Sequence, residues 1–103
     1  MTIRVPTLRA RVTVTKGGSG TYELDDREHT IGRSRRADIV VPDPSVSGRH
    51  AMLSPRGVAF VLEDLGSTNG TTVNGRPIAG EHVLEGGETI GIGEARIRYE
   101  RLA

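Results

Sequence analysis

The sequence contains no cysteine and no tryptophan, and only three aromatic residues occur among its 103 positions. Without cysteine, disulfide-stabilised scaffolds, thiol catalysis and cysteine-ligated zinc sites are excluded. No apolar run approaches the roughly 20 residues that span a bilayer, and the N-terminus lacks the charged and apolar regions of a secretion signal. These absences favour a cytoplasmic protein that does not bind membranes.

An excess of charge of one sign is also missing, because 14 basic residues face 13 acidic ones. This balance argues against a nucleic-acid partner, since a general polyanion binder needs many more cations. The charges are nevertheless unevenly divided: residues 1–56 carry 10 basic and 6 acidic side chains, and residues 57–103 carry 4 and 7. A positive first half suits an anionic ligand, although solvated surfaces show such a division by chance too.

Helices have little room between the glycines and prolines. The longest stretch free of both is residues 21–31, and these 11 residues show no apolar stripe at helical spacing. Apolar and polar residues alternate instead with a period of two, which is typical of strands with one buried face. We therefore predict an all-β sandwich or barrel over residues 7–103, preceded by a flexible leader at residues 1–6.

The expected strands and turns follow from this alternation. The strands are expected at residues 8–15, 21–25, 29–32, 38–41, 58–62, 89–93 and 95–101, with turns at residues 55–57, 74–75 and 86–87. Val58, Phe60 and Leu62 are expected to share one buried face. His29 and His82 belong to no motif, so we expect both at the surface.

Two polar segments are longer than a hairpin needs, Pro42–His50 (PDPSVSGRH) and Leu65–Thr71 (LGSTNGT). Ahead of them, residues 32–36 hold three arginines behind a glycine. Loops of a sandwich gather at its ends, so the three segments could meet. Their guanidinium, hydroxyl and amide donors can together capture a phosphate dianion without a metal. The same residue types also simply shape turns, so composition leaves both interpretations open.

Five ordered blocks between residues 29 and 101 closely resemble the forkhead-associated (FHA) domain. They are IGRS at 31–34, DIV at 38–40, VSGRHA at 46–51, EDLGSTNGT at 63–71 together with VNG at 73–75, and LEGGETIGIG at 84–93. The resemblance implies a β-sandwich of about eleven short strands with its ligand loops at one end. It also implies a module that binds phosphothreonine peptides in Ser/Thr kinase signalling.

Roles in ligand binding follow from the resemblance alone. Arg33 would bind the phosphate, and Ser47 would offer it both a hydroxyl and a backbone donor. Thr68 would add a further phosphate contact. Asn69 would hydrogen-bond the main chain of the peptide beside the phosphothreonine.

Further roles are implied around these four residues. Ser45 lies where the family often reads the third residue after the phosphothreonine, and Gly48 stands beside the peptide where many members carry a longer side chain. Gly32, His50 and Gly70 would be structural supports, with His50 tying down the Ser47 loop. Arg35 and Arg36 could attract acidic flanks of the peptide or simply be solvated, with solvation the favoured interpretation, and Arg49 would support the loop rather than touch the ligand.

Other classes of protein are less well supported. Ser47, His50 and Asp64 contain the side chains of a hydrolase triad, but two of them share one loop and no Gly-x-Ser-x-Gly motif is present. We expect no enzyme activity, cofactor or metal. A phosphate-independent adaptor or assembly module on the same sandwich is the alternative function. The chain is expected to be a monomer, with self-association left open.

Overall fold

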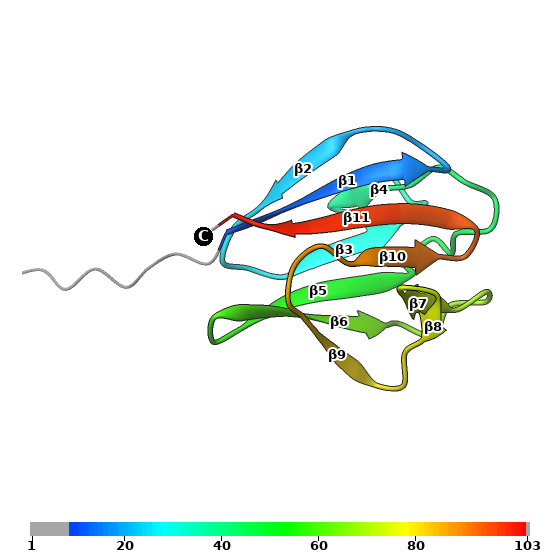
Figure 1. Cartoon of the computed structure of the whole chain (residues 1–103). Helices are drawn as coiled ribbons and strands as arrows, with labels where there is room; N and C mark the ends of the chain where they lie inside the picture. Colours follow the sequence, from blue (N-terminus) through cyan, green and yellow to red (C-terminus); the bar gives the residue numbers. More distant parts are fainter. Residues whose placement is uncertain (1–8, 103) are drawn as a thin grey trace, which may run out of the picture.

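The computed structural model describes residues 9–102, which form eleven β-strands in two sheets (Figure 1). The strands are β1 (Ala10–Lys16), β2 (Thr21–Leu24), β3 (His29–Gly32), β4 (Ile39–Val40), β5 (Ala51–Arg56), β6 (Ala59–Asp64), β7 (Thr71–Val73), β8 (Arg76–Pro77), β9 (Glu81–Leu84), β10 (Thr89–Ile92) and β11 (Ala95–Arg101). The predicted all-β sandwich is confirmed. The expected leader at residues 1–6 lies outside the described residues. Within residues 9–102, no helix suited to crossing a membrane is found.

The two sheets have the strand orders β2-β1-β11-β10-β7-β8 and β4-β3-β5-β6-β9. The first sheet joins the two ends of the described chain, since β1 pairs with β11 through Val12 opposite Tyr99. Strands β3 and β4 are parallel, and the other strand pairs are antiparallel. The tight turn expected at Asn74 and Gly75 is confirmed, with φ angles of 51° and 83° that suit a type I′ turn.

The core lies between the sheets and is filled from alternating positions. In β11, Ala95, Ile97 and Tyr99 are fully buried, as their alternation with polar residues predicts. Phe60 meets Tyr99 edge to face across the core, with ring centroids 6.4 Å apart. Aliphatic side chains supply most of the remaining burial, because the chain has so few aromatic residues.

The turn expected at residues 55–57 begins two positions later, at Gly57. Strand β5 continues through Pro55, which lies opposite Phe60, and the chain reverses at Gly57 and Val58. Val58 is therefore 74% exposed and does not share the buried face of Phe60. The proline suggested a turn in the sequence, but the pairing with β6 extends past it.

The expectation that His29 lies at the surface is also wrong. Its side chain is only 3% exposed and packs edge-on against Phe60, with ring centroids 6.1 Å apart. Its Nε2 atom lies 3.2 Å from the backbone oxygen of Asp25, so the ring keeps a polar partner. His82, in contrast, is exposed as expected.

Strands β5, β7, β8 and β9 are missing from the sequence-based prediction, which placed a turn over the end of β5 and no element at β7. In β9 the first three of four residues are exposed, so the strand shows no alternation of apolar and polar residues. Strand β8 consists of Arg76 and Pro77 at the edge of its sheet, where a proline costs no hydrogen bond with a further strand. Edge strands with little burial carry little periodic signal.

Candidate functional site

Three loops and one turn meet at the same end of the sandwich (Figure 1). They are the β3–β4 loop (33–38), the β4–β5 loop (41–50), the β6–β7 loop (65–70) and the β10–β11 turn (93–94). The first two are joined directly, because the N–H of Arg33 donates to the Ser47 carbonyl at 3.0 Å and that of Ser34 donates to the Gly48 carbonyl at 3.2 Å. The structure therefore brings together the segments that the sequence analysis singles out.

Gly32 makes this close approach of the loops feasible. A Cβ atom added to it would lie 2.1 Å from the carbonyl oxygen of Gly48 and 3.2 Å from the Cα atom of Arg49. The first distance is far inside van der Waals contact and the second is tight, and both atoms belong to backbone that cannot rotate away. Only glycine therefore fits at position 32 without a shift of the β4–β5 loop.

His50 links two loops from a fully buried position. Its Nδ1 atom accepts the backbone N–H of Ser47 at 3.1 Å, and its Nε2 atom lies 2.8 Å from the Gly70 carbonyl oxygen. Since Nδ1 accepts, the ring proton sits on Nε2 and is donated to Gly70. These bonds correct one expected contact, because the backbone N–H of Ser47 is already used and is not a free phosphate donor.

The donors that remain free lie around Ser47. The Ser47 hydroxyl oxygen accepts the backbone N–H of Thr68 at 3.1 Å, which leaves its own proton to donate elsewhere. Among the described residues, neither the N–H of Gly48 nor the hydroxyl of Thr68 has a hydrogen-bond partner. Gly48 is exposed, and no atom lies within 4 Å of where its Cβ would be. Two hydroxyls and one amide can therefore face a ligand.

Asp64 organises the β6–β7 loop, a role that the sequence analysis missed. Its carboxylate accepts the N–H groups of Gly66 and Ser67 and the hydroxyls of Ser67 and Thr71. Burial raises the pKa of Asp64, but the hydrogen bonds from Ser67, Thr71 and Gly66 outweigh it and hold the pKa at about 2. An aspartate three residues before a serine in a glycine-rich loop is the signal that could have identified this role.

Ser45 is engaged within the protein. Its hydroxyl donates to the Asp43 carboxylate at 2.6 Å and accepts the N–H of Glu94 at 2.8 Å. The hydrogen bonds from the side chain and backbone of Ser45 hold the pKa of Asp43 below its usual value. The Ser45 carbonyl in turn accepts the side-chain amide of Asn69 at 2.8 Å. The contact expected between Ser45 and a peptide stays a prediction, while its place in this network is a finding.

The β10–β11 turn supports the same network at Gly93. This residue has a φ of +58°, and an added Cβ would lie 2.5 Å from the Ser45 carbonyl oxygen. Its N–H donates to the Gly70 carbonyl at 3.1 Å, the oxygen that also lies beside the His50 ring. Gly93 belongs to the block at 84–93, but no periodic pattern in the sequence connects it with the loops that it supports.

Four arginines at this end of the molecule have no acidic partner within residues 9–102. Among the described residues, the ion pairs involve Arg9, Arg11, Arg27, Arg56 and Arg98, and none involves Arg33, Arg35, Arg36 or Arg49. All four lie in exposed positions of the two loops beside Ser47. The interpretation of Arg49 as support for the loop is not borne out by a contact, since its side chain makes no hydrogen bond with residues 9–102. The loops therefore carry uncompensated positive charge.

The geometry does not assemble a hydrolase triad. Both ring nitrogens of His50 are engaged, by the Ser47 N–H and by the Gly70 carbonyl, so neither can take the proton of the Ser47 hydroxyl. The Asp64 carboxylate lies in the β6–β7 loop network described above rather than against the histidine ring. Within residues 9–102, no group of three or more acidic or histidine side chains is arranged to hold a metal ion.

Comparison with known proteins points to one family. The sequence model of the FHA domain matches residues 29–93. The FHA domain-containing protein FhaA of Mycobacterium tuberculosis is 43% identical over 81 residues, which cover 78% of this chain and 15% of FhaA. This chain thus corresponds to a small part of that relative.

Solved structures agree with the sequence match. A structure from a structural and functional analysis of phosphothreonine-dependent FHA domain interactions superposes with a TM-score of 0.84 and 35% identity, covering 92% of this chain and 98% of that one. The FhaA FHA domain complexed with the intracellular domain of Rv3910 gives a TM-score of 0.81 and 36% identity, covering 88% and 99%. Likeness of this kind extends over nearly the whole sandwich and both of its sheets.

Proposed function

Because the chain belongs to the FHA domain family, we propose that it binds proteins carrying a phosphorylated threonine and so mediates phosphorylation-dependent recognition in Ser/Thr kinase signalling. The observation that carries this proposal is the group of free hydrogen-bond donors around Ser47, on loops that His50 links to each other. Arginines that form no ion pair within residues 9–102 lie in the loops beside them. The solved structure from the analysis of phosphothreonine-dependent FHA domain interactions supports it, since its fold covers 92% of this chain. Kinases draw on cytoplasmic ATP, so we place this recognition in the cytoplasm.

The phosphate would be bound by charge and by directed hydrogen bonds. A phosphothreonine carries a charge of about −1.5 to −2 at pH 7 and three acceptor oxygens. Arg33 offers a planar fork of donors, and the hydroxyls of Ser47 and Thr68 add two more. Gly48 contributes its backbone N–H, in place of the Ser47 N–H that His50 occupies. An unphosphorylated threonine would leave all these donors without their partner.

Asn69 would hold the peptide main chain next to the phosphothreonine. One N–H of its side-chain amide is bonded to the Ser45 carbonyl, which fixes the orientation of the amide group. The carbonyl oxygen of the same side chain takes no part in this bond, so it can accept a peptide N–H. A rigid amide adds little entropic cost to binding, because its rotamer is already set.

The proposed activity is binding without catalysis. Because both ring nitrogens of His50 are engaged, the imidazole is not available as a general base for the Ser47 hydroxyl. The chain covers only part of its curated relatives, including 15% of FhaA and 61% of the glycogen accumulation regulator GarA. We therefore propose this role for the module, with the partner defined by its phosphothreonine.

Isothermal titration calorimetry tests the proposal with a peptide in a phosphothreonine form and an unphosphorylated form. We expect only the phosphorylated form to bind. Since hydrogen bonds to charged groups contribute about 1.5–3 kcal/mol each, Arg33→Ala should weaken binding by roughly tenfold to a hundredfold. Arg101→Ala is the matched control, because it removes another exposed arginine, at the end of β11 away from the loops.

Two results would count against phosphothreonine recognition. Equal binding of both peptide forms would support the alternative of a phosphate-independent adaptor. Unchanged affinity of the Arg33→Ala protein would remove Arg33 from the phosphate site. Circular dichroism of each variant checks that the sandwich is retained.

A further inference from the structure

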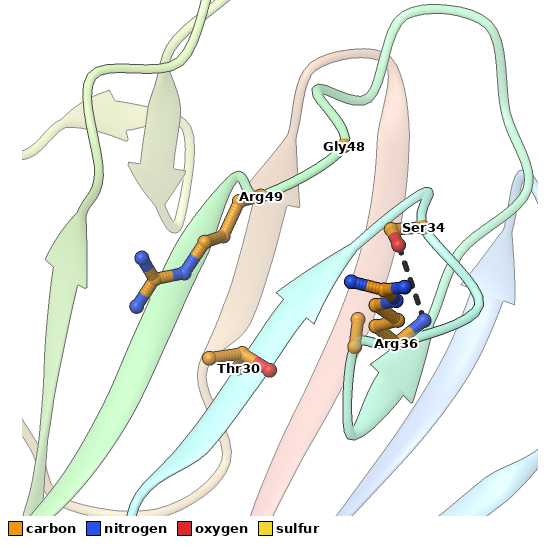
Figure 2. Close-up of a pocket in the computed structure, with 6 residues that line it drawn as sticks. Thr30, Ser34, Arg36, Gly48 and Arg49 are labelled. Atoms are coloured by element: carbon orange, nitrogen blue, oxygen red, sulfur yellow. Dashed lines mark hydrogen bonds between the residues drawn. The ribbon is translucent and has the colours of Figure 1, made fainter.

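A hollow of about 280 Å³ opens beside the proposed phosphate site (Figure 2). Its lining comes from strand β3, the β3–β4 loop and the segment before β5, and consists of Thr30, Ser34, Arg36, Ala37, Gly48 and Arg49. Figure 2 shows Arg36 on one side of Thr30 and Arg49 on the other, with the Arg49 side chain directed away from Arg36. The volume suits one extended side chain rather than a large ligand.

The two arginines give the hollow a positive charge that nothing in the described protein offsets. Both are exposed, and neither forms an ion pair within residues 9–102. Arg27 is different, because it contacts the carboxylates of Asp25 at 2.9 Å and Asp38 at 3.7 Å. Unpaired guanidinium groups beside a hollow are ready to accept an anionic group.

Asp38 is an acidic side chain that contacts this lining at Thr30, and it is already engaged. One of its oxygens accepts the N–H and the hydroxyl of Thr30 at 2.9 Å and 3.1 Å. Its other oxygen faces Arg27, the ion pair described above. Asp38 therefore neutralises Arg27 and fixes Thr30, and it leaves the charges of Arg36 and Arg49 unopposed.

The hollow is continuous with the proposed phosphate site. Gly48 lines the hollow, and its free N–H is one of the proposed phosphate donors. Ser34 also connects the hollow with the phosphate site, since its N–H donates to the Gly48 carbonyl and its hydroxyl oxygen accepts the backbone N–H of Arg36 at 3.1 Å. A peptide whose phosphothreonine sits at Ser47 would thus extend one flank across the hollow.

We propose that this hollow binds a glutamate or aspartate side chain that flanks the phosphothreonine in the same peptide. The inference rests on the proposed function and adds to it a preference for acidic neighbours. The aliphatic stem of Arg36 or Arg49 would cover the methylene groups of the acidic side chain, and the guanidinium group of that arginine would pair with its carboxylate. Arg33, Ser47 and Thr68 stay reserved for the phosphate.

The test compares three phosphothreonine peptides by fluorescence polarisation: one with acidic residues before the phosphothreonine, one with acidic residues after it, and one with alanines at both flanks. We expect one of the acidic peptides to bind more tightly than the alanine peptide. The double variant Arg36→Ala/Arg49→Ala should lose this preference, with a loss of about threefold to tenfold for the preferred peptide. Its affinity for the alanine peptide should change much less.

Arg101→Ala is the matched control. It removes an exposed arginine that forms no ion pair within residues 9–102 and lies at the end of β11 away from the loops, so the preference should stay unchanged. Equal affinity of the wild type for all three phosphopeptides would overturn this inference and leave the proposed function standing. A preference that survives the double variant would also overturn it. If none of the phosphopeptides binds, the proposed function fails and this inference fails with it.

Discussion

Gly32 and Gly48 lie so close that a Cβ atom on Gly32 would stand 2.1 Å from the carbonyl oxygen of Gly48. This contact sets the β4–β5 loop against the end of β3, and it places Ser47 beside the backbone of Arg33. The proposed phosphate site therefore depends on the absence of a side chain from a residue that touches no ligand. Packing behind the loop decides where the donors in front of it point.

Gly32→Ala should destabilise the domain, because the added methyl group meets backbone atoms that cannot rotate away. We expect a loss of about 1–3 kcal/mol in the free energy of unfolding, measured by chemical denaturation. Gly48→Ala is the matched control, since no atom lies within 4 Å of its added carbon. A Gly32→Ala protein as stable as the Gly48→Ala protein would contradict this account of the loop.

His50→Ala should lower both stability and affinity for a phosphothreonine peptide. The change leaves the Ser47 N–H and the Gly70 carbonyl without their partners and opens a cavity at a fully buried position. We expect a loss of at least about 2 kcal/mol in the free energy of unfolding. Calorimetric melting measures this, with the exposed His82→Ala expected to melt like the wild type. Normal melting of His50→Ala would argue against the linking role.

Ser45→Ala should weaken the binding of all phosphothreonine peptides to a similar degree. The hydroxyl of Ser45 is bonded to Asp43 and to the N–H of Glu94, so its removal loosens the β4–β5 loop, in which the Ser45 carbonyl holds the side-chain amide of Asn69. A peptide array that varies the third residue after the phosphothreonine distinguishes this role from direct contact. A change in preference at that one position, with unchanged affinity elsewhere, would instead assign Ser45 to peptide recognition.

Stability should fall in acid partly through Asp64. Its pKa is lowered to about 2 from an ordinary value of 3.8, so the folded state binds this proton less readily than the unfolded state. The stabilisation from the ionised group is therefore complete above about pH 4 and is lost as the pH falls towards 2. The free energy of unfolding, measured from pH 7 to 2, should decline more steeply for the wild type than for Asp64→Asn.

The control for this experiment is Asp26→Asn, which removes an exposed carboxylate without removing the hydrogen bonds to Gly66, Ser67 and Thr71. Its stability should decline with pH as that of the wild type does. Parallel declines of the wild type and Asp64→Asn between pH 4 and 2 would show that Asp64 does not contribute to acid sensitivity.

The long strands β1 and β11 could be predicted from sequence, whereas β5, whose burial also alternates, was missed because its proline indicated a turn. In β1 and β11, buried Val12 and Ile97 alternate with partly or fully exposed neighbours, and this period of two is visible along the chain itself. Strand β9 could not be predicted, because most of it is exposed. The burial of His29 could not be predicted either, because it depends on packing against Phe60. Phe60 lies on β6, which β5 separates from β3 in the sheet.

The order of residues along the chain was enough to identify an all-β protein, its long polar loops and the residue types able to bind a phosphate. Which atoms of those residues are free was decided only by the folded structure. His50 takes the Ser47 N–H and leaves the Gly48 N–H unpaired, while Asp38 pairs with Arg27 and not with Arg36. The reason is physical: alternation is a local property of the chain, whereas hydrogen bonds and ion pairs depend on which distant segments the sheets bring together.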